Sequence, residues 1–536
     1  MLNLTLLKKD KLELREYQTR AAQSALERGN TLVVMPTALG KTFVALLAIA
    51  HLLAQPANAK RKALFMTPTK PLAIQQTQRS RELLEIQEEE IIVVTGEMPP
   101  AKRQRAYASA RVVCATPQTI ENDLDKGILD LRDFCVAVFD EAHRAVGEYA
   151  YTAVGKRARQ TMGLLVIALT ASPGAKREKI EDVCEALGIK NIELLRSEDE
   201  DVQRFAKPVE VEWVFVNLPP QFAGVRRVLS QMLDEEARKL EEKELLPHGM
   251  RESKRFLLAL QIRLQAKIPY TYRELSTVAK MMNLLHSIEL LESQGVVTLK
   301  NFLEGLDKRE KKSRAVLAII ADPRTPEIIA KCNEIIANGL DHPKVYELKR
   351  IVGAAVREGQ SVIVFAHYRD SVDKLLAELN ALRDVHARFI VGRAGEKGMK
   401  QEEQRSLLQD FRDKKFNVLV GTSILEEGLD LPSVDLVVFY EAVPSEIRLI
   451  QRRGRAGRIK AGKAIILIAK GTRDEAYLWS AKHKEEKMHR TLSRMSAKMD
   501  AKKNAEAAKA DAAAGETKKR AKPVPKKGQT AMSDFT

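Results

Sequence analysis

The sequence contains few cysteines, and those it has lie far apart. Among 536 residues there are four, with no C-x-x-C pair: Cys114, Cys135, Cys184 and Cys332. Zinc sites and disulfide frameworks need cysteines at regular short spacings, so this pattern favours buried free thiols.

Long apolar runs are also missing. No stretch reaches the roughly 18 apolar residues that span a bilayer as a helix. The N-terminus meets Lys8, Lys9 and Asp10 before the apolar core of a signal peptide could form. We therefore expect a soluble, cytoplasmic protein without a membrane partner.

The charge is strongly one-sided. The formal net charge is +17 and the isoelectric point is about 9.5. The stretch from Lys498 onward holds ten basic and five acidic residues, which leaves +12 on the rest of the chain. Solubility combined with a basic tail is the alternative explanation, but the tail does not account for the excess. The charge therefore favours a polyanionic partner such as nucleic acid.

Short apolar runs alternate with helical stretches in the first part of the chain. The length suggests about three domains. Runs rich in Val and Ile are typical of strands buried on both faces, so the alternation predicts a doubly wound parallel α/β sheet over residues 1–210. The expected strands are residues 31–35, 63–67, 91–95, 111–115, 135–139 and 164–169.

The pattern changes twice after this region. Residues 211–340 contain long, charged amphipathic segments and almost no strand signal, which predicts an inserted all-α domain. Alternation resumes over residues 341–495 and predicts a second parallel sheet. Residues 496–536 are rich in Ala and Lys, with too little apolar surface to offset chain entropy, so we expect a disordered basic tail. The expected helices are 221–246, 252–266 and 272–294, and the later strands are 361–366, 387–391, 417–422, 436–440 and 464–469.

A candidate phosphate-binding loop follows the first predicted strand. A loop between a strand and a helix N-terminus gathers backbone N–H groups around a phosphate. Lys41 would reach the β- and γ-phosphates of ATP and Thr42 would hold Mg²⁺, within a loop that includes Thr37, Ala38 and Gly40. Ala38 stands where a glycine is usual, at a cost of roughly 1–2 kcal/mol if it is left-handed, so ATP binding could be weakened. A coincidental turn is the alternative.

Two adjacent carboxylates end another apolar strand. Asp140 and Glu141 follow residues 135–139 and open the string Asp-Glu-Ala-His. Phosphoryl transfer needs one carboxylate for the metal and one to polarise water, and we assign these roles to Asp140 and Glu141 respectively. A solvated helix start is the ordinary reading of these letters alone. Their position about 100 residues after the phosphate loop, at the end of a buried strand, favours catalysis.

These two motifs, in this order, resemble superfamily 2 helicases. The resemblance implies two RecA-like sheets, and it gives roles to several residues nearby. Arg15 and Gln18 would contact the adenine, while His143, Thr170 and Ser172 would couple the ATP site to nucleic acid. Residues at other strand ends would touch the nucleic-acid backbone, although a plain turn is the simpler reading of each: Thr69, Lys70, Thr95, Gly96, Thr116 and Gln118.

The second sheet carries the most specific string, Gln-Arg-Arg-Gly-Arg-Ala-Gly-Arg at residues 451–458. It resembles helicase motif VI, which implies catalytic roles for Gln451, Arg455 and Arg458, with the two arginines reaching the γ-phosphate. A generic phosphate-binding patch is the alternative. The resemblance also places Gly428 and Asp430 near the nucleotide, and Arg369, Arg393 and Thr422 on nucleic acid.

A helical insert between two such sheets narrows the resemblance to one branch. This branch contains archaeal Hef, the Fanconi-anaemia M and Mph helicases, Dicer and the RIG-I-like receptors. Within it, the chain looks closest to Hef at residues 341–349, 391–394 and 422–430. This implies a motor acting on forked and branched DNA. An RNA-stimulated ATPase of the RIG-I or Dicer type, and a nucleic-acid scaffold without turnover, are the alternatives. Hef often carries an XPF-type nuclease, which is not seen here, so we expect no nuclease activity.

Two further segments suggest binding surfaces. The insert's basic residues are a candidate DNA face, with an ordinary solvated helix surface as the alternative: Arg251, Lys254, Arg255, Arg263, Lys267 and Arg273. Near the end of the tail, Gln529, Met532 and Phe535 have the spacing of a sliding-clamp-binding peptide, although Thr536 replaces its usual second aromatic residue. Chance spacing is the alternative for this peptide.

Overall fold

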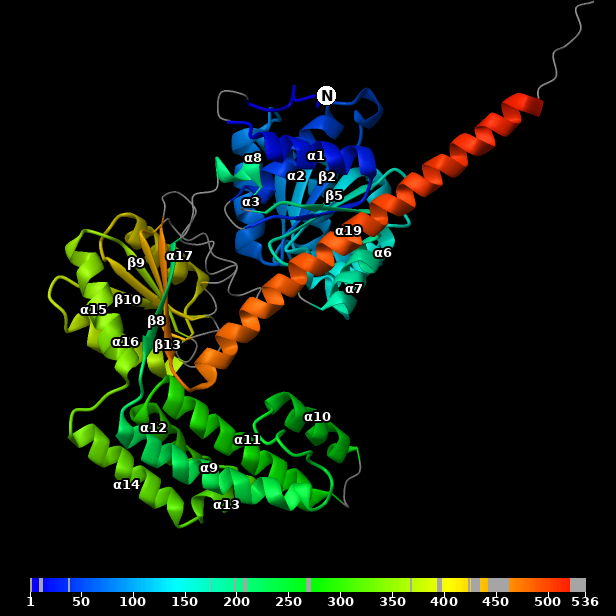
Figure 1. The fold of residues 1–536 in the computed structure, drawn as a ribbon. Coiled ribbons are helices and arrows are strands. Elements are labelled where there is room, and N and C mark those ends of the chain that lie inside the picture. Colours follow the sequence, from blue (N-terminus) through cyan, green and yellow to red (C-terminus); the bar gives the residue numbers. More distant parts are fainter. Residues whose placement is uncertain are drawn as a thin grey trace, which may run out of the picture.

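Two sheets and a helical bundle make up the computed structural model (Figure 1). It describes residues 2–8, 13–36, 39–174, 176–196, 199–205, 210–266, 271–366, 369–392, 398–422, 425, 434–441 and 462–520, of which 369–371, 502 and 506–520 are described by their backbone alone. Within these ranges no helix is both long and apolar enough to cross a bilayer.

The first sheet and its helices form lobe 1. All of its strand pairs are parallel, in the order β3-β4-β2-β5-β6-β1-β7. Apolar clusters cover both faces, so the predicted doubly wound sheet is confirmed. The strands are β1 (Thr31–Val34), β2 (Lys62–Met66), β3 (Ile91–Val94), β4 (Val112–Ala115), β5 (Phe134–Asp140), β6 (Leu165–Thr170) and β7 (Asn191–Leu194). The helices are α1 (Glu16–Arg28), α2 (Lys41–Leu53), α3 (Lys70–Leu83), α4 (Pro100–Ser109), α5 (Pro117–Asp125), α6 (Ala150–Ala158), α7 (Arg177–Leu187) and α8 (Glu200–Gln203).

The second sheet and its helices form lobe 2. Its parallel order is β10-β11-β9-β12-β13-β8, so the strand that precedes the insert pairs with the last strand of the sheet. Residues 211–216 were predicted to begin the helical insert, and that boundary is wrong because they lie in β8. The elements are β8 (Glu210–Val216), α15 (Pro343–Arg357), β9 (Val362–Phe365), α16 (Arg369–Asn380), β10 (Ala387–Ile390), α17 (Gln401–Arg412), β11 (Val418–Gly421), β12 (Leu436–Phe439) and β13 (Lys463–Ala469).

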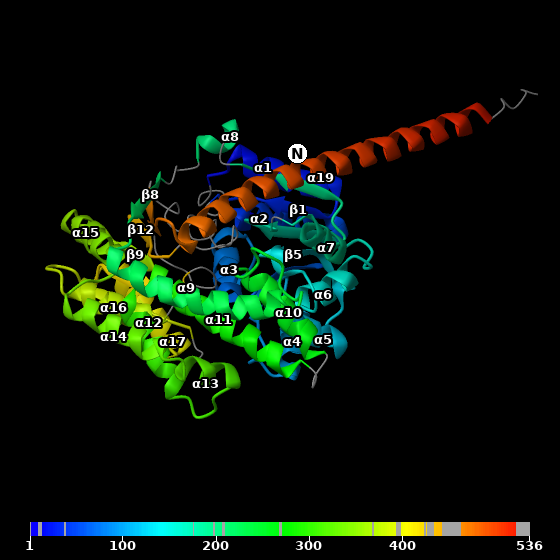
Figure 2. The ribbon, with the colours of Figure 1, turned by 60° about the horizontal axis from the view of Figure 1, so that its bottom comes forward.

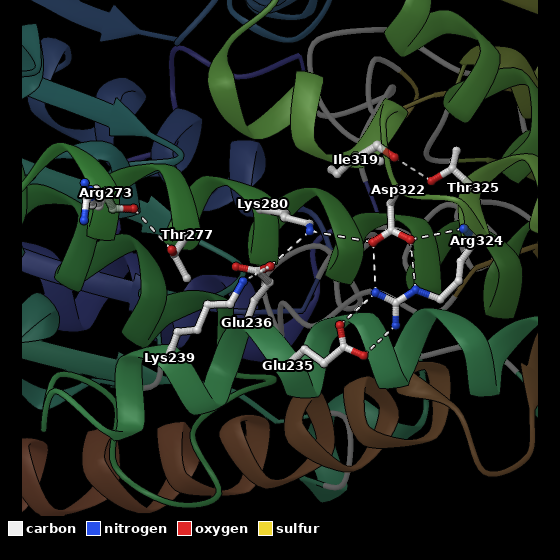
Figure 3. A network of polar contacts seen from close by, with 10 residues as sticks. All are labelled: Glu235, Glu236, Lys239, Arg273, Thr277, Lys280, Ile319, Asp322, Arg324 and Thr325. Carbon is white, nitrogen blue, oxygen red and sulfur yellow. Dashed lines mark hydrogen bonds and ion pairs between the residues drawn. The ribbon is translucent and has the colours of Figure 1, made fainter.

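The insert is a helical bundle (Figure 2), as predicted. It has its own apolar core. Polar contacts also join its helices (Figure 3). Arg324 donates to both carboxylate oxygens of Glu235, at 2.6 and 2.7 Å, and also pairs with Asp322. Lys280 lies 3.0 Å from Glu236, which ties α11 to α9. The helices are α9 (Pro220–Glu241), α10 (Lys254–Gln265), α11 (Tyr272–Ser293), α12 (Val296–Asp307), α13 (Arg314–Ile320) and α14 (Arg324–Ala337).

One long helix, α19 (Arg473–Arg520), leaves lobe 2 after β13 and crosses lobe 1 (Figures 1 and 2). The disordered tail was predicted to begin at residue 496, and this start is too early because the helix continues to Arg520. Alanine and lysine favour helix, and Met488, Leu492, Met495 and Met499 form an apolar stripe that packs on lobe 1. Residues 521–536 lie outside the described residues.

The junction between the insert and lobe 2 contains a buried histidine. His342 caps α15: its Nδ1 accepts from the Lys344 backbone N–H at 3.2 Å, and its Nε2 lies 2.9 Å from the Glu292 carbonyl oxygen. These bonds require a neutral ring. Burial, followed by the charge of Lys344, lowers the pKa of His342 from 6.5 to about 3.

Acid is therefore expected to destabilise this junction. In the unfolded chain His342 is protonated below pH 6.5, but in the folded chain it stays neutral until about pH 3. The free energy of unfolding therefore falls as the pH is lowered from 6.5 to about 3. The loss approaches ~1.4 kcal/mol per pH unit. His342→Asn keeps a capping oxygen but does not titrate, and urea denaturation at a series of pH values should show a shallower dependence. The exposed control His248→Asn should keep the wild-type slope, and an unchanged slope in His342→Asn would contradict the assignment.

Candidate functional site

Three neighbouring strands of lobe 1 end side by side. Val34 of β1 is in register with Thr170 of β6, and Leu169 of β6 is in register with Asp140 of β5. Parallel strands lie about 4.8 Å apart, so the outer two ends are about 10 Å apart. The loops that follow these strands therefore surround a space in which one nucleotide's phosphates could contact them all.

Gly40 shapes the candidate phosphate loop. It precedes α2 in a left-handed conformation, with φ 84° and ψ 45°, and a Cβ there would lie 2.5 Å from Gln18 Nε2. Only glycine meets both requirements without strain. Lys41 begins α2, and its Nζ lies 3.4 Å from the Met35 carbonyl oxygen. Thr37 and Ala38 lie outside the described residues.

Residues of α1 hold this loop from behind. Gln18 Nε2 donates to the Leu39 carbonyl oxygen at 2.9 Å, and the Tyr17 hydroxyl donates to the same oxygen at 3.0 Å. Arg15 donates to the Tyr17 hydroxyl at 3.1 Å. The structure thus brings Arg15 and Gln18 to the loop. Sequence analysis missed Tyr17, although its place between those two residues was a usable signal.

The acidic pair occupies a strained turn at the end of β5. Asp140 is 8% exposed, and its Oδ1 accepts from the Glu141 backbone N–H at 3.0 Å. Glu141 has φ 51° and ψ 48°, a left-handed conformation that costs a non-glycine residue about 1–3 kcal/mol. Such strain persists where neighbouring contacts fix it, and it is concentrated at functional sites.

Tyr151 supplies one of those contacts. Its buried hydroxyl lies 2.7 Å from the Asp140 carbonyl oxygen and 3.0 Å from the Met66 carbonyl oxygen, which joins the ends of β5 and β2. Burial, followed by the charge of Asp140, raises the pKa of Tyr151 well above its usual value, so the hydroxyl keeps its proton for donation. No local motif marked this residue in the sequence.

The predicted coupling residues lie beside the acidic pair. His143 Nδ1 is 3.2 Å from Thr170 Oγ1 and 3.4 Å from Glu141 Oε2. The Ser172 backbone N–H donates to Thr170 Oγ1 at 3.1 Å. The loops after β5 and β6 are therefore linked through side chains.

The residues of this edge fit Mg²⁺ with ATP better than a metal caged by protein alone. Within the described ranges, no three His, Cys, Asp or Glu side chains form a metal-binding group. Mg²⁺ in phosphoryl-transfer sites takes one or two protein ligands and completes its shell with phosphate and water. Asp140 and Thr42 could supply those two ligands. Thr42 Oγ1 also accepts from Gln76 Nε2 at 3.3 Å.

The candidate nucleic-acid residues occupy the other half of the same edge. They follow β2, β4 and β3, which are neighbours in the sheet, so the structure brings all six together. Thr116 Oγ1 lies 2.9 Å from Thr119 Oγ1, Lys70 pairs with Glu97, and Gln118 is exposed. The candidate ATP-site residues and the candidate nucleic-acid residues thus lie at the same edge of one sheet but follow different strands.

At the carboxyl ends of the lobe 2 strands, the structure describes only some of the candidate residues. Thr422 follows β11 and is 9% exposed. A Cβ on Gly421, the last residue of β11, would lie 2.5 Å from Leu425 Cδ1 and 2.8 Å from Ile390 Cγ2, so a larger residue there would displace these side chains. Arg369 begins α16, and only its backbone is described. The remaining candidates of lobe 2 lie outside the described residues: Arg393, Gly428, Asp430, Gln451, Arg455 and Arg458.

Three family models match consecutive parts of the chain. The DEAD/DEAH box helicase model matches residues 15–180, and the helicase conserved C-terminal domain matches residues 334–460. Between them, a model described as a helical bundle of a putative ATP-dependent RNA helicase matches residues 221–338. Their order follows lobe 1, the insert and lobe 2.

Curated proteins and a solved structure extend this similarity. A putative ATP-dependent RNA helicase of Methanocaldococcus jannaschii is 37% identical over 495 residues, covering 91% of this chain and 62% of that protein. The ATP-dependent DNA helicase mph1 of Neurospora crassa is 33% identical, covering 87% of this chain and 42% of its own length. The crystal structure of the Pyrococcus furiosus Hef helicase domain is 41% identical, with a TM-score of 0.69, covering 89% of this chain and 100% of that chain. The chain thus spans less than two thirds of the curated relatives it matches.

Proposed function

Because the chain belongs to the Hef-type branch of the DEAD/DEAH-box helicases, we propose that it is an ATP-dependent DNA motor that remodels forked and branched DNA. One observation carries the proposal. Buried Asp140 and strained Glu141 lie at the end of β5, and the Gly40–Lys41 turn follows β1, on the two sides of β6. Beside them lies a separate row of hydroxyl and amide groups suited to a phosphate backbone.

Each part of the ATP site has a defined task in this proposal. Lys41 would neutralise the β- and γ-phosphates, and Thr42 and Asp140 would hold Mg²⁺, which would supply Lewis-acid polarisation of the γ-phosphoryl group. Glu141 accepts a proton from the attacking water. By the sequence resemblance, Arg455 and Arg458 of lobe 2 would reach the γ-phosphate from the opposite wall, so hydrolysis would weaken lobe closure. The resemblance would also place Gln451, Gly428 and Asp430 near the nucleotide, and Arg15 and Gln18 beside the adenine.

The insert contributes a narrower DNA face than its sequence suggested. Arg251 pairs with Asp234 at 2.7 Å and Lys254 pairs with Glu289, so both are engaged within the protein. Arg255 and Arg263 are exposed on α10, beside the exposed side chains of Leu258 and Ile262. We assign DNA contact to Arg255 and Arg263. Arg273 is also exposed, in α11, and Lys267 lies outside the described residues.

Removing these two charges is expected to flatten the salt dependence of DNA binding. Each lost phosphate contact lowers the slope of log K against log salt by about 0.9, so Arg255→Gln with Arg263→Gln should lower it by roughly 1–2. Titration of forked DNA at several salt concentrations measures the slope. Lys179→Gln with Lys190→Gln removes equal charge from exposed sites on lobe 1 and should leave the slope unchanged. Equal slopes in both double variants would contradict the assignment.

The C-terminal peptide is a proposed sliding-clamp ligand. Gln529, Met532 and Phe535 lie outside the described residues, and the proposal rests on their spacing. We expect deletion of residues 529–536 to abolish capture of the chain on immobilised clamp without lowering ATP turnover. Replacing Met532 and Phe535 with alanine should have the same effect. Undiminished capture after deletion would show that the spacing arose by chance.

The proposed function is tested by comparing how strongly different nucleic acids stimulate ATP turnover. A relative named as an RNA helicase makes an RNA-stimulated ATPase the second candidate. Turnover should be measured alone and with duplex RNA, duplex DNA, forked DNA and a four-way junction. We expect the branched DNAs to stimulate most. Strongest stimulation by RNA would favour the second candidate, and no turnover with any of them would favour a scaffold.

A further inference from the structure

The helix α19 connects the two lobes through specific contacts. It begins at Arg473, after the last strand of lobe 2, and its later turns lie against β7 of lobe 1 (Figure 1). Ser496 Oγ donates to the Ile192 carbonyl oxygen at 3.0 Å, and Arg196 donates to Ser493 Oγ at 2.6 Å. Arg28 and Asp500 form an ion pair at 2.6 Å. The helix is therefore seated in lobe 1, not merely adjacent to it.

Met488 is the residue of α19 that meets the ATP-site edge. Its side chain is fully buried, and its Sδ accepts a hydrogen bond from Ser172 Oγ at 2.9 Å. Ser172 is itself 1% exposed, and its Oγ also accepts from the Gly174 backbone N–H at 3.4 Å. The loop after β6 is thus held by the side chain of Met488, which belongs to α19, the helix that follows lobe 2 in the chain.

A continuous series of contacts runs from this loop to the acidic pair. Ser172 donates its backbone N–H to Thr170 Oγ1, which lies 3.2 Å from His143 Nδ1. His143 Nδ1 in turn lies 3.4 Å from Glu141 Oε2. Each link is at least partly buried, so water competes little for these contacts. Glu141 holds a strained conformation that such neighbours must maintain.

We propose that Met488 is a positioning residue of the ATPase: by holding Ser172, it orients His143 and Glu141 for hydrolysis. The inference rests on the proposed role of Glu141 as the base. Through α19, lobe 2 would influence the ATP site in a second way, in addition to the proposed contact of its arginines with the γ-phosphate. Displacement of α19 would shift the base and change the rate of hydrolysis, with little effect on ATP affinity.

The test compares Met488 with a neighbour in the same helix. Leu492, one turn later, is also fully buried in the lobe 1 core, so Leu492→Ala controls for lost packing. We expect Met488→Ala to lower the kcat of DNA-stimulated ATP turnover by about tenfold or more, with the KM for ATP changed by less than about threefold. Leu492→Ala should lower the melting temperature comparably while keeping kcat within about twofold of wild type. Equal kcat values in the two variants would overturn the proposal.

A double-mutant cycle with Ser172→Ala tests the path of the effect. If Met488 acts through the Ser172 hydroxyl, Met488→Leu and Ser172→Ala should each lower kcat, and the double variant should be no slower than the slower single variant. Additive effects would overturn the proposed path. Glu141→Gln is measured in parallel: if it keeps turnover, the proposed base is wrong. If it loses turnover while Met488→Ala matches Leu492→Ala, the inference about Met488 alone fails.

Discussion

Replacing Glu141 with glutamine is expected to lower ATP turnover on saturating forked DNA by about 10²–10⁴-fold. Glutamine has the same shape but cannot accept the proton of the attacking water. The turn that carries Glu141 is fixed by Asp140, His143 and Tyr151, so the amide should occupy the carboxylate's place. ATP binding should persist, because Lys41, Thr42 and Asp140 are unchanged.

The exposed Glu148, which follows the same turn, provides the matched control. Glu148→Gln removes the same charge close by and should leave kcat within about twofold of wild type. Steady-state turnover and equilibrium binding of a fluorescent ATP analogue together separate chemistry from affinity. A Glu141→Gln chain that keeps more than about a tenth of wild-type kcat would show that another group accepts the proton.

Replacing Arg458 with alanine should have a still larger effect, a fall in kcat of about 10³–10⁵-fold. The residue belongs to the string at residues 451–458 and lies outside the described residues, so this prediction comes from the sequence resemblance. A guanidinium from lobe 2 would stabilise charge on the γ-phosphoryl group only when the lobes are closed. Its loss should therefore affect the rate more than the binding of ATP.

Arg453→Ala is the control for charge within the same string. If the string were a generic phosphate patch, both variants would weaken DNA binding and lower turnover to a similar extent. If Arg458 acts on the γ-phosphate, Arg453→Ala should keep kcat within about tenfold of wild type. Single-turnover hydrolysis at saturating DNA distinguishes the two, and equal kcat values would contradict the specific role.

Local pattern was enough to predict the sheets and the strand ends at which the lobe 1 candidates lie. Strands such as β1 and β5 are continuous apolar runs, because a parallel sheet covered on both faces leaves no polar positions. The motif residues follow such strands directly, so their common edge could be expected. Gly40, Lys41, Asp140 and Glu141 were predicted together for this reason.

Features that depend on contacts distant in the sequence were not predicted. β8 is a partly exposed edge strand, and its partner among the described strands, β13, lies some 250 residues later. Its short apolar run, Trp213–Val216, directly precedes the long helices of the insert and was not assigned to a strand. The apolar stripe of α19 is sparse and becomes meaningful only against lobe 1. Tyr17, Tyr151 and Met488 support the site from behind through bonds to backbone or to other side chains. Tyr17 lies within the Arg15–Gln18 string, but neither Tyr151 nor Met488 belongs to a motif whose spacing implies that role.

A fork-regression assay tests the central claim most directly. It measures how fast a model replication fork is converted into products with exchanged strands. We predict that this chain moves the branch point only when ATP is hydrolysed, and that Lys41→Ala binds the fork with wild-type affinity but leaves it in place. Movement of the branch by Lys41→Ala, or equal movement with ATP and with a non-hydrolysable analogue, would contradict the account of an ATP-driven motor.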